Sequence, residues 1–99
     1  MIDQLLDKVK AYLLEDNWNR ALSTVEEAID LMPSHAESWE WKGLVYDAQK
    51  NYEEAIAAFG QAIALYPSSS HYLKRRGRAY CMLDQYEEGL ADFDQAITF

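Results

Sequence analysis

Apolar residues recur at steps of three and four along the whole chain, and no segment alternates between apolar and polar residues as a strand would. In the middle of the chain, Trp39, Gly43 and Tyr46 form one such stripe, and Ala55 and Phe59 belong to the next. This period predicts amphipathic helices that each bury one face. We expect helices at residues 2–14, 17–31, 36–49, 52–65, 70–82 and 85–98.

Short polar joints separate the predicted helices, so consecutive helices must run antiparallel. Three pairs of residues have the spacing of a capping box, in which a side chain at the helix start and an acid three residues later each bind a free amide. These pairs are Ser34 with Glu37, Asn51 with Glu54, and Asp84 with Glu87. We therefore expect reciprocal side-chain caps at the starts of the corresponding helices.

The same pattern returns every 34 residues, as the spacing of Pro33 and Pro67 and that of Gly43 and Gly77 show. Other positions keep this step through the whole chain: Tyr12, Tyr46 and Tyr80; Trp18, Tyr52 and Tyr86; Val25, Phe59 and Phe93; Ala28, Ala62 and Ala96. The chain therefore divides into repeats at 2–35, 36–69 and 70–99, the last being four residues short of a full unit. A helical hairpin cannot cover its own apolar face, so the units must stack into a single domain over residues 1–99.

The second unit resembles the tetratricopeptide repeat, with matching residues at Trp39, Gly43, Tyr46, Ala55, Phe59, Ala62 and Pro67. The third unit departs at Gly89, where the family usually has alanine, and a glycine inside a helix costs about 1 kcal/mol. The first unit departs at Val9, where the family has a small residue. The resemblance covers essentially the whole chain. It implies an all-α fold, namely an α-solenoid of three antiparallel helix pairs wound into a right-handed superhelix.

In proteins of this family, the first helices of successive units line a concave groove that receives a peptide. Transferred to this sequence, the resemblance implies a partner-binding groove formed by Leu6, Lys10, Leu13, Trp41, Leu44, Lys74, Arg75 and Arg78. Trp41 is a candidate anchor, because other residues already fill the buried positions of its helix and large aromatic residues often dominate binding. In the alternative interpretation, Trp41 packs against Leu6 or a neighbouring helix and meets no partner.

The distribution of charge narrows the class of partner. With 17 acidic and 9 basic residues, the chain has a net charge of −8, which disfavours nucleic acid and anionic membranes. Lys74, Arg75 and Arg78 share one helical face and suit an acidic segment or a C-terminal carboxylate of a protein or peptide partner. Alternatively, the basic helix 70–82 and the acidic helix 85–98 neutralise each other. Arg76 is expected to extend along the surface.

Chaperone-binding members of the family clamp a C-terminal carboxylate with five side chains, normally Lys, Asn, Asn, Lys and Arg. The corresponding positions of this chain hold Leu6, Lys10, Trp41, His71 and Arg75. Only Arg75 agrees with the family pattern. The resemblance therefore argues against binding to the tails of Hsp70 or Hsp90.

The sequence contains no pattern of residues that predicts catalysis or metal binding. There is no P-loop, GxGxxG, GxSxG or HExxH motif, and Cys81 is the only cysteine. His35, His71 and Cys81 do not share the i, i+4 face that a helical metal site needs. We expect no enzyme activity, no metal and no cofactor.

We expect a cytoplasmic protein, because the chain has a single cysteine, no apolar run of about 20 residues and no basic secretory segment. The sequence stops at Ile97 and Phe99 without the polar helix that usually follows the last repeat. Either the chain belongs to a longer protein, or this end associates with another copy or partner. We expect a non-catalytic protein-interaction module or scaffold. The alternative is an oligomerisation or assembly element that stacks through the uncapped C-terminal helix pair.

Overall fold

The computed structural model describes all of residues 1–99 and contains six α-helices and no strand. The helices are α1 (Ile2–Leu14), α2 (Trp18–Leu31), α3 (Ala36–Ala48), α4 (Tyr52–Leu65), α5 (Ser70–Met82) and α6 (Tyr86–Thr98). The expected all-α fold is confirmed. Only residues 17, 49 and 85, at predicted helix ends, lie outside the observed helices.

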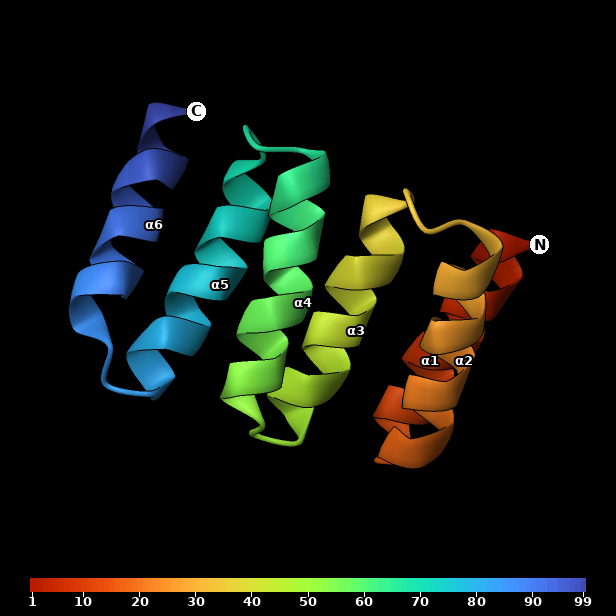
Figure 1. The fold of residues 1–99 in the computed structure, drawn as a ribbon. Coiled ribbons are helices and arrows are strands. Elements are labelled where there is room, and N and C mark those ends of the chain that lie inside the picture. The colour runs from red at the N-terminus through yellow and green to blue at the C-terminus, as the bar shows by residue number, and fades with distance from the viewer.

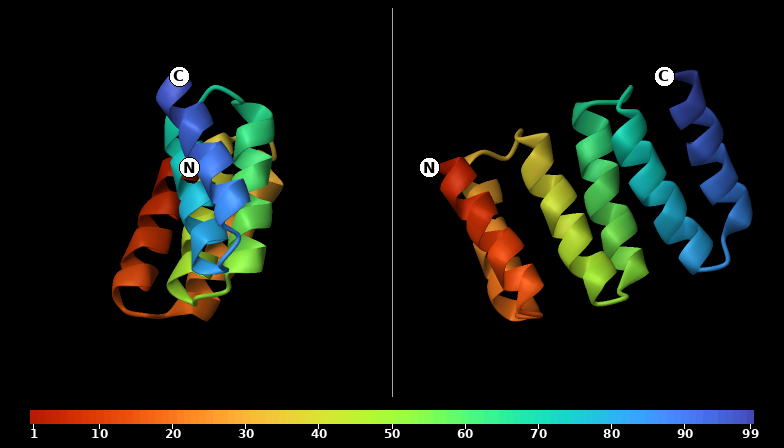
Figure 2. Two further views of the ribbon diagram at one scale, coloured as in Figure 1. Left: turned by 90° about the vertical axis from the view of Figure 1, so that its left-hand side faces the viewer. Right: turned by 180° about the vertical axis from the view of Figure 1, so that it is seen from behind.

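The helices form three antiparallel pairs that follow one another in chain order, so the two termini lie at opposite ends of the molecule (Figure 1). Figure 2 shows the same row of tilted helices from one end and from behind. The molecule measures 36 × 24 × 17 Å along its principal axes. Each second helix packs against the first helix of the following pair, which joins the pairs into a short solenoid.

The core of the first pair continues into the second pair. Val9 of α1, Val25 of α2 and Val45 of α3 are all fully buried and belong to one apolar cluster. Val9 occupies the position where the family has a small residue, and its complete burial shows that this pair accommodates a valine there. Burial of these side chains joins the first two units.

Glycines allow the two helices of the later pairs to approach each other closely. A Cβ atom on Gly43 would overlap the ring of Phe59. Gly89, where the family usually has alanine, faces Cys81, whose Sγ would lie 2.5 Å from a Cβ at this position. The departure at Gly89 therefore has a packing reason, because the α5–α6 contact leaves no room for a methyl group.

The three tight joints share one backbone geometry. Asp16, Lys50 and Asp84 have φ angles of 56°, 61° and 62°, the left-handed conformation that commonly ends a helix. At the joint between α3 and α4, the Asn51 N–H donates to the Tyr46 carbonyl at 2.9 Å. The same bond recurs 34 residues before and after, so each joint satisfies a carbonyl left free at the helix end.

The expected reciprocal side-chain caps are absent. Ser34 and Asp84 lie one residue before the N-cap positions of α3 and α6, so their oxygens are not placed to bind the first free amides. Asn51 is the N-cap of α4, but its side chain makes no capping hydrogen bond. Side-chain caps occur at two other helix starts, where Asn17 accepts from the Arg20 N–H at 3.4 Å and Ser69 accepts from the Tyr72 N–H at 3.3 Å.

Candidate functional site

The first helices of the three pairs, α1, α3 and α5, are neighbours in the structure. Helix α1 contacts α3 directly, and ion pairs between side chains join α3 to α5. We refer to the side of the molecule formed by these helices as the α1–α3–α5 face. Seven of the eight predicted groove residues are at least partly exposed, namely Lys10, Leu13, Trp41, Leu44, Lys74, Arg75 and Arg78.

Leu6 is the exception among the predicted groove residues. It is only 3% exposed and belongs to the apolar cluster that joins α1, α2 and α3. The prediction that Leu6 lines a groove is therefore wrong. Its position on the helix is right for that face, but the neighbouring helices enclose a leucine at this position in the core.

Trp41 combines burial with contacts at the surface. Its half-buried side chain packs against the apolar cluster that contains Leu6, as the alternative interpretation proposed. The Lys10 ammonium lies 5.3 Å from the centre of the Trp41 ring, and the indole N–H donates to Glu37 at 3.4 Å. The ring is thereby held in place, with a cation stacked over its face.

A nearly buried carboxylate, that of Glu40, accounts for the charge of Arg75. The Arg75 Nε donates to Glu40 Oε2 at 2.6 Å, and His71 Nε2 lies 2.6 Å from the same oxygen. Glu40 is 7% exposed, and a carboxylate at such a position needs a cationic or hydrogen-bonding partner. Arg75 is thus directed at α3 and away from an external ligand.

The other arginines of the basic segment are also paired within the chain. Arg78 Nη1 donates to both carboxylate oxygens of Asp47, at 3.0 and 2.9 Å. Arg76, expected to extend along the surface, instead makes two hydrogen bonds of 2.8 Å to the buried Asp92 of α6. The Asp92 carboxylate raises the pKa of the Arg76 guanidinium. Lys74 is the one basic residue of α5 without an ion pair.

The expected neutralisation between α5 and α6 therefore applies only to Arg76 and Asp92. Arg75 and Arg78 reach back to α3, whose carboxylates precede them by 35 and 31 residues. These pairs depend on how α3 and α5 pack. No motif in the sequence signals them.

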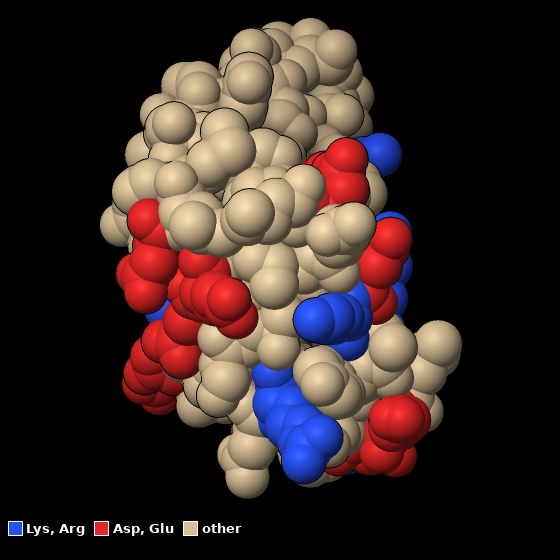
Figure 3. Space-filling view, turned by 90° about the vertical axis from the view of Figure 1, so that its right-hand side faces the viewer, with Lys and Arg blue, Asp and Glu red and all other residues tan.

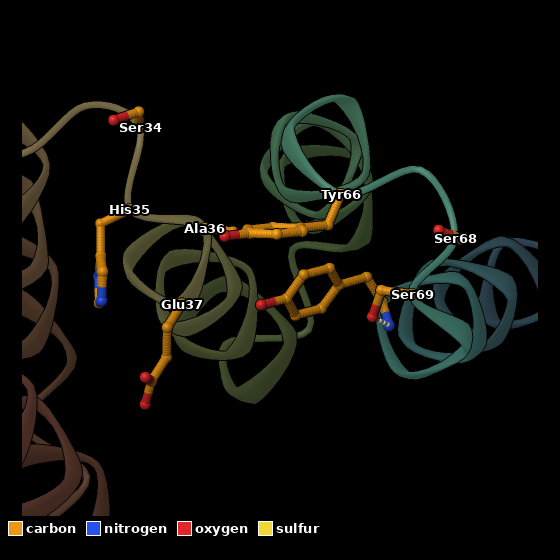
Figure 4. Close-up of a pocket in the computed structure, with 8 residues that line it drawn as sticks. Ser34, His35, Ala36, Glu37, Tyr66, Ser68 and Ser69 are labelled. Atoms are coloured by element: carbon orange, nitrogen blue, oxygen red, sulfur yellow. Dashed lines mark hydrogen bonds between the residues drawn. The ribbon is translucent and has the colours of Figure 1, made fainter.

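A cavity of about 560 Å³ lies where the 32–35 and 66–69 joints meet. Its lining residues are Ser34, His35, Ala36, Glu37, Tyr66, Ser68, Ser69 and Tyr72. In Figure 4, the Tyr66 ring extends from the end of α4 toward Ala36 at the start of α3. Burial raises the pKa of Tyr72, and the charges of Glu40 and Glu37 raise it further. Sequence analysis missed this cavity, because its residues come from two joints and share no helical face.

The chemistry of these surfaces suits recognition better than catalysis. The one contact between a hydroxyl and an imidazole, 2.9 Å between Ser38 Oγ and His35 Nδ1, involves a fully buried serine that no substrate reaches. No group of three or more His, Cys, Asp or Glu side chains is placed to hold a metal ion. None of the helices has the length and apolar character required to cross a membrane.

Known proteins share both the sequence pattern and the fold. The family model described as tetratricopeptide repeat matches residues 6–70 and 48–99. A crystal structure of MamA superposes with a TM-score of 0.92 at 23% identity, over 99% of this chain and 57% of that one. The second such domain of Spaghetti (RPAP3), bound to the HSP90 peptide SRMEEVD, gives 0.89 at 26% identity, over 98% of this chain and 90% of that one.

A CopN–Scc3 complex structure also has this fold, with a TM-score of 0.88 at 14% identity, over 96% of this chain and 56% of that one. The present chain spans little more than half the length of the MamA chains that it matches. A search of curated protein sequences found no match. The similarity to solved structures confirms the expected solenoid of helix pairs.

Proposed function

Because the chain belongs to the tetratricopeptide repeat family, we propose that it is a non-catalytic protein-interaction module that binds a peptide segment of a partner along the α1–α3–α5 face. Structures with the same fold include a domain bound to a peptide and a complex of two proteins. The observation that carries the proposal is Trp41. Its half-buried ring is held at the α1–α3 boundary, where Lys10 lies over it.

The proposed contact surface consists of Lys10, Leu13, Trp41, Leu44 and Lys74, with Arg75 and Arg78 as additional members. A half-buried aromatic ring between partly exposed leucines favours an apolar side chain of the peptide. Since the arginines are paired within the chain, the positive charge left for an acidic residue of the peptide comes from Lys74 and Lys10. We propose a cytoplasmic setting, in which the unpaired Cys81 stays reduced.

The SRMEEVD peptide bound by the RPAP3 domain is a poor fit to this proposal. Of the five positions that clamp a C-terminal carboxylate in chaperone-binding members, the first holds the buried Leu6. At two others, His71 and Arg75 contact Glu40. A peptide carboxylate would have to displace Glu40 from Arg75. We therefore expect no saturable binding when labelled SRMEEVD is titrated with the chain and followed by fluorescence anisotropy.

The proposal is tested with peptides selected from a displayed library against the folded chain. Nuclear magnetic resonance titration of the isotope-labelled chain then locates each selected peptide. The indole signal of Trp41 should shift on binding, whereas that of Trp18, whose indole nitrogen is buried, should stay in place. Shifts confined to residues of α2, α4 and α6 would overturn the proposal.

A charge-reversal pair gives the matched control. Lys74→Glu should weaken the selected peptide by more than about 1 kcal/mol, roughly fivefold, by replacing attraction with repulsion. Lys50→Glu makes the same change of charge at a joint between helices. Its affinity for the peptide should equal that of the unmodified chain. Equal losses in both variants would show that only the net charge matters.

A further inference from the structure

One face of α6 carries large apolar side chains that no helix covers. Tyr86, Leu90 and Ile97 are 57%, 59% and 80% exposed. Their spacing of four and seven residues places them on one side of the helix. Phe93, between them in sequence, packs inward, where its ring would lie 3.1 Å from a Cβ on Gly77. We refer to Tyr86, Leu90 and Ile97 as the α6 stripe.

The repeat shows what covers this face elsewhere in the same chain. The positions that lie 34 and 68 residues earlier hold Trp18, Leu22 and Ile29 in α2 and Tyr52, Ile56 and Ile63 in α4. All of these side chains are at least partly buried. Helix α2 packs against α3, and α4 packs against α5. The cover for a stripe at this register is therefore the first helix of a following pair.

Helix α1 has the complementary uncovered face. Val45 of α3 and Ala79 of α5 occupy equivalent positions and are fully buried, and Val45 packs in the cluster formed with α1 and α2. The equivalent residue of α1 is Ala11, which is exposed. Gln4, two turns earlier, is also exposed, whereas its equivalent Ser38 is fully buried. Helix α1 thus presents the surface that α3 buries against the preceding pair.

The two ends of the molecule also carry complementary charges. Lys42 of α3 lies 3.8 Å from Glu26 of α2 and so links the first two pairs. The positions that correspond to these residues at the free ends are Lys8 and Asp94, and both are exposed. Figure 3 shows basic side chains in the middle and lower part of the end formed by α1 and α2. Helix α6 has acidic residues and no basic residue.

We propose that a second copy of this chain binds head to tail, with α1 of one copy covering the α6 stripe of the other. In this arrangement α1 packs on α6 as α3 packs on α2, and Lys8 faces Asp94 across the contact. The two surfaces are different, so the contact is heterologous and repeats instead of closing as a two-fold dimer. This contact uses the ends of the solenoid and leaves the α1–α3–α5 face available to a peptide.

The mass of the 99-residue chain in solution tests this proposal. Sedimentation equilibrium should show an average mass that rises above the 11.4 kDa of one chain as concentration increases, without stopping at two copies. The double variant Leu90→Glu/Ile97→Glu removes the α6 surface and should stay monomeric. Leu65→Glu, an apolar-to-acid change at an exposed residue of α4, should associate like the unmodified chain.

Mixing variants distinguishes a head-to-tail contact from a symmetric one. Ala11→Glu removes only the α1 surface and should also be monomeric alone. Mixed with Leu90→Glu/Ile97→Glu, it should form a complex of one copy of each and nothing larger, because one intact surface of each kind remains. Circular dichroism of each variant checks that the helices are retained, as expected for substitutions at exposed residues.

A charge swap tests the register of the contact. Lys8→Glu should weaken association about twofold to fivefold, the range for an exposed ion pair, and adding Asp94→Lys in the same chain should restore it. A chain that is monomeric at every concentration would overturn the proposal. A dimer that does not grow further and that is insensitive to Ala11→Glu would overturn it as well, in favour of a symmetric α6–α6 contact.

Discussion

The Arg75 side chain donates a hydrogen bond of 2.6 Å to Glu40 and so joins α5 to α3 across 35 residues of sequence. Glu40 is 7% exposed, and His71 lies 2.6 Å from the same carboxylate oxygen. An acid that is held in this way is stable in its position only while a partner compensates for its lost hydration. The contact therefore affects both the stability of the chain and the charge that its α1–α3–α5 face presents.

Replacing Arg75 by alanine should destabilise the chain. We expect a loss of about 1–2 kcal/mol in the free energy of unfolding, less than for a fully buried pair, because Arg75 is partly exposed and His71 remains. Urea denaturation measures this change. Lys74→Ala, which removes a neighbouring cation without an ion pair, should change it by less than about 0.5 kcal/mol. Equal effects of the two variants would contradict this assignment.

Replacing Glu40 by glutamine should release Arg75 for an external carboxylate. The substitution keeps a hydrogen-bonding side chain and removes the competing charge, so a short peptide that ends in an acidic residue should bind about fivefold more tightly, or about 1 kcal/mol. Fluorescence anisotropy with the labelled peptide measures the affinity. The same peptide with an amidated C-terminus serves as a control and should gain less. An unchanged affinity for both peptides would show that Arg75 remains inaccessible.

Two glycines should respond to alanine in opposite directions. Gly43→Ala places a methyl group against the Phe59 ring and should destabilise the chain by about 1–3 kcal/mol. At Gly60 the nearest side-chain atom would be Arg76 Nη1 at 3.9 Å, so alanine fits. Gly60→Ala should stabilise the chain by up to about 1 kcal/mol through its higher helix propensity. Thermal unfolding of both variants gives the sign, and a stabilising Gly43→Ala would refute the packing argument.

Alkaline pH should destabilise the fold through its tyrosines. Burial raises the pKa of Tyr46 and Tyr72 above 10.0, and the hydrogen bond to Asp84 raises that of Tyr86. Below this pH the phenols are protonated in both the folded and the unfolded chain. As the pH rises past it, the unfolded chain ionises first, so the free energy of unfolding falls.

Urea denaturation at about pH 9 and about pH 11 measures this loss of stability. Titration followed by phenolate absorbance should show that some of the seven tyrosines ionise late in the folded chain. Tyr72→Phe removes one of the shifted groups and should reduce the difference between the two conditions. Tyr66→Phe, at an exposed residue for which no such effect is expected, is the matched control. A free energy of unfolding that does not depend on pH in this range would contradict the prediction.

The candidate site could be predicted only in part. The helical period correctly indicated that most of the chosen residues on α1, α3 and α5 are at least partly exposed, with Trp41 among them. It could not show that Leu6 is enclosed, because burial depends on how closely α1, α2 and α3 approach. Nor could it reveal the cavity beside Tyr66, since its lining comes from joints that become neighbours only after the pairs stack.

The sequence by itself determined the helices, their antiparallel pairing and the 34-residue repeat, because helical period, glycine placement and short joints act over a few residues at a time. Only the tertiary structure decided which charges are free. Arg75, Arg76 and Arg78 form one basic run in the sequence, yet each pairs with a carboxylate on another helix. Such pairs form between residues that are distant in sequence, and they depend on distances of a few ångströms that only the packing of the helices sets.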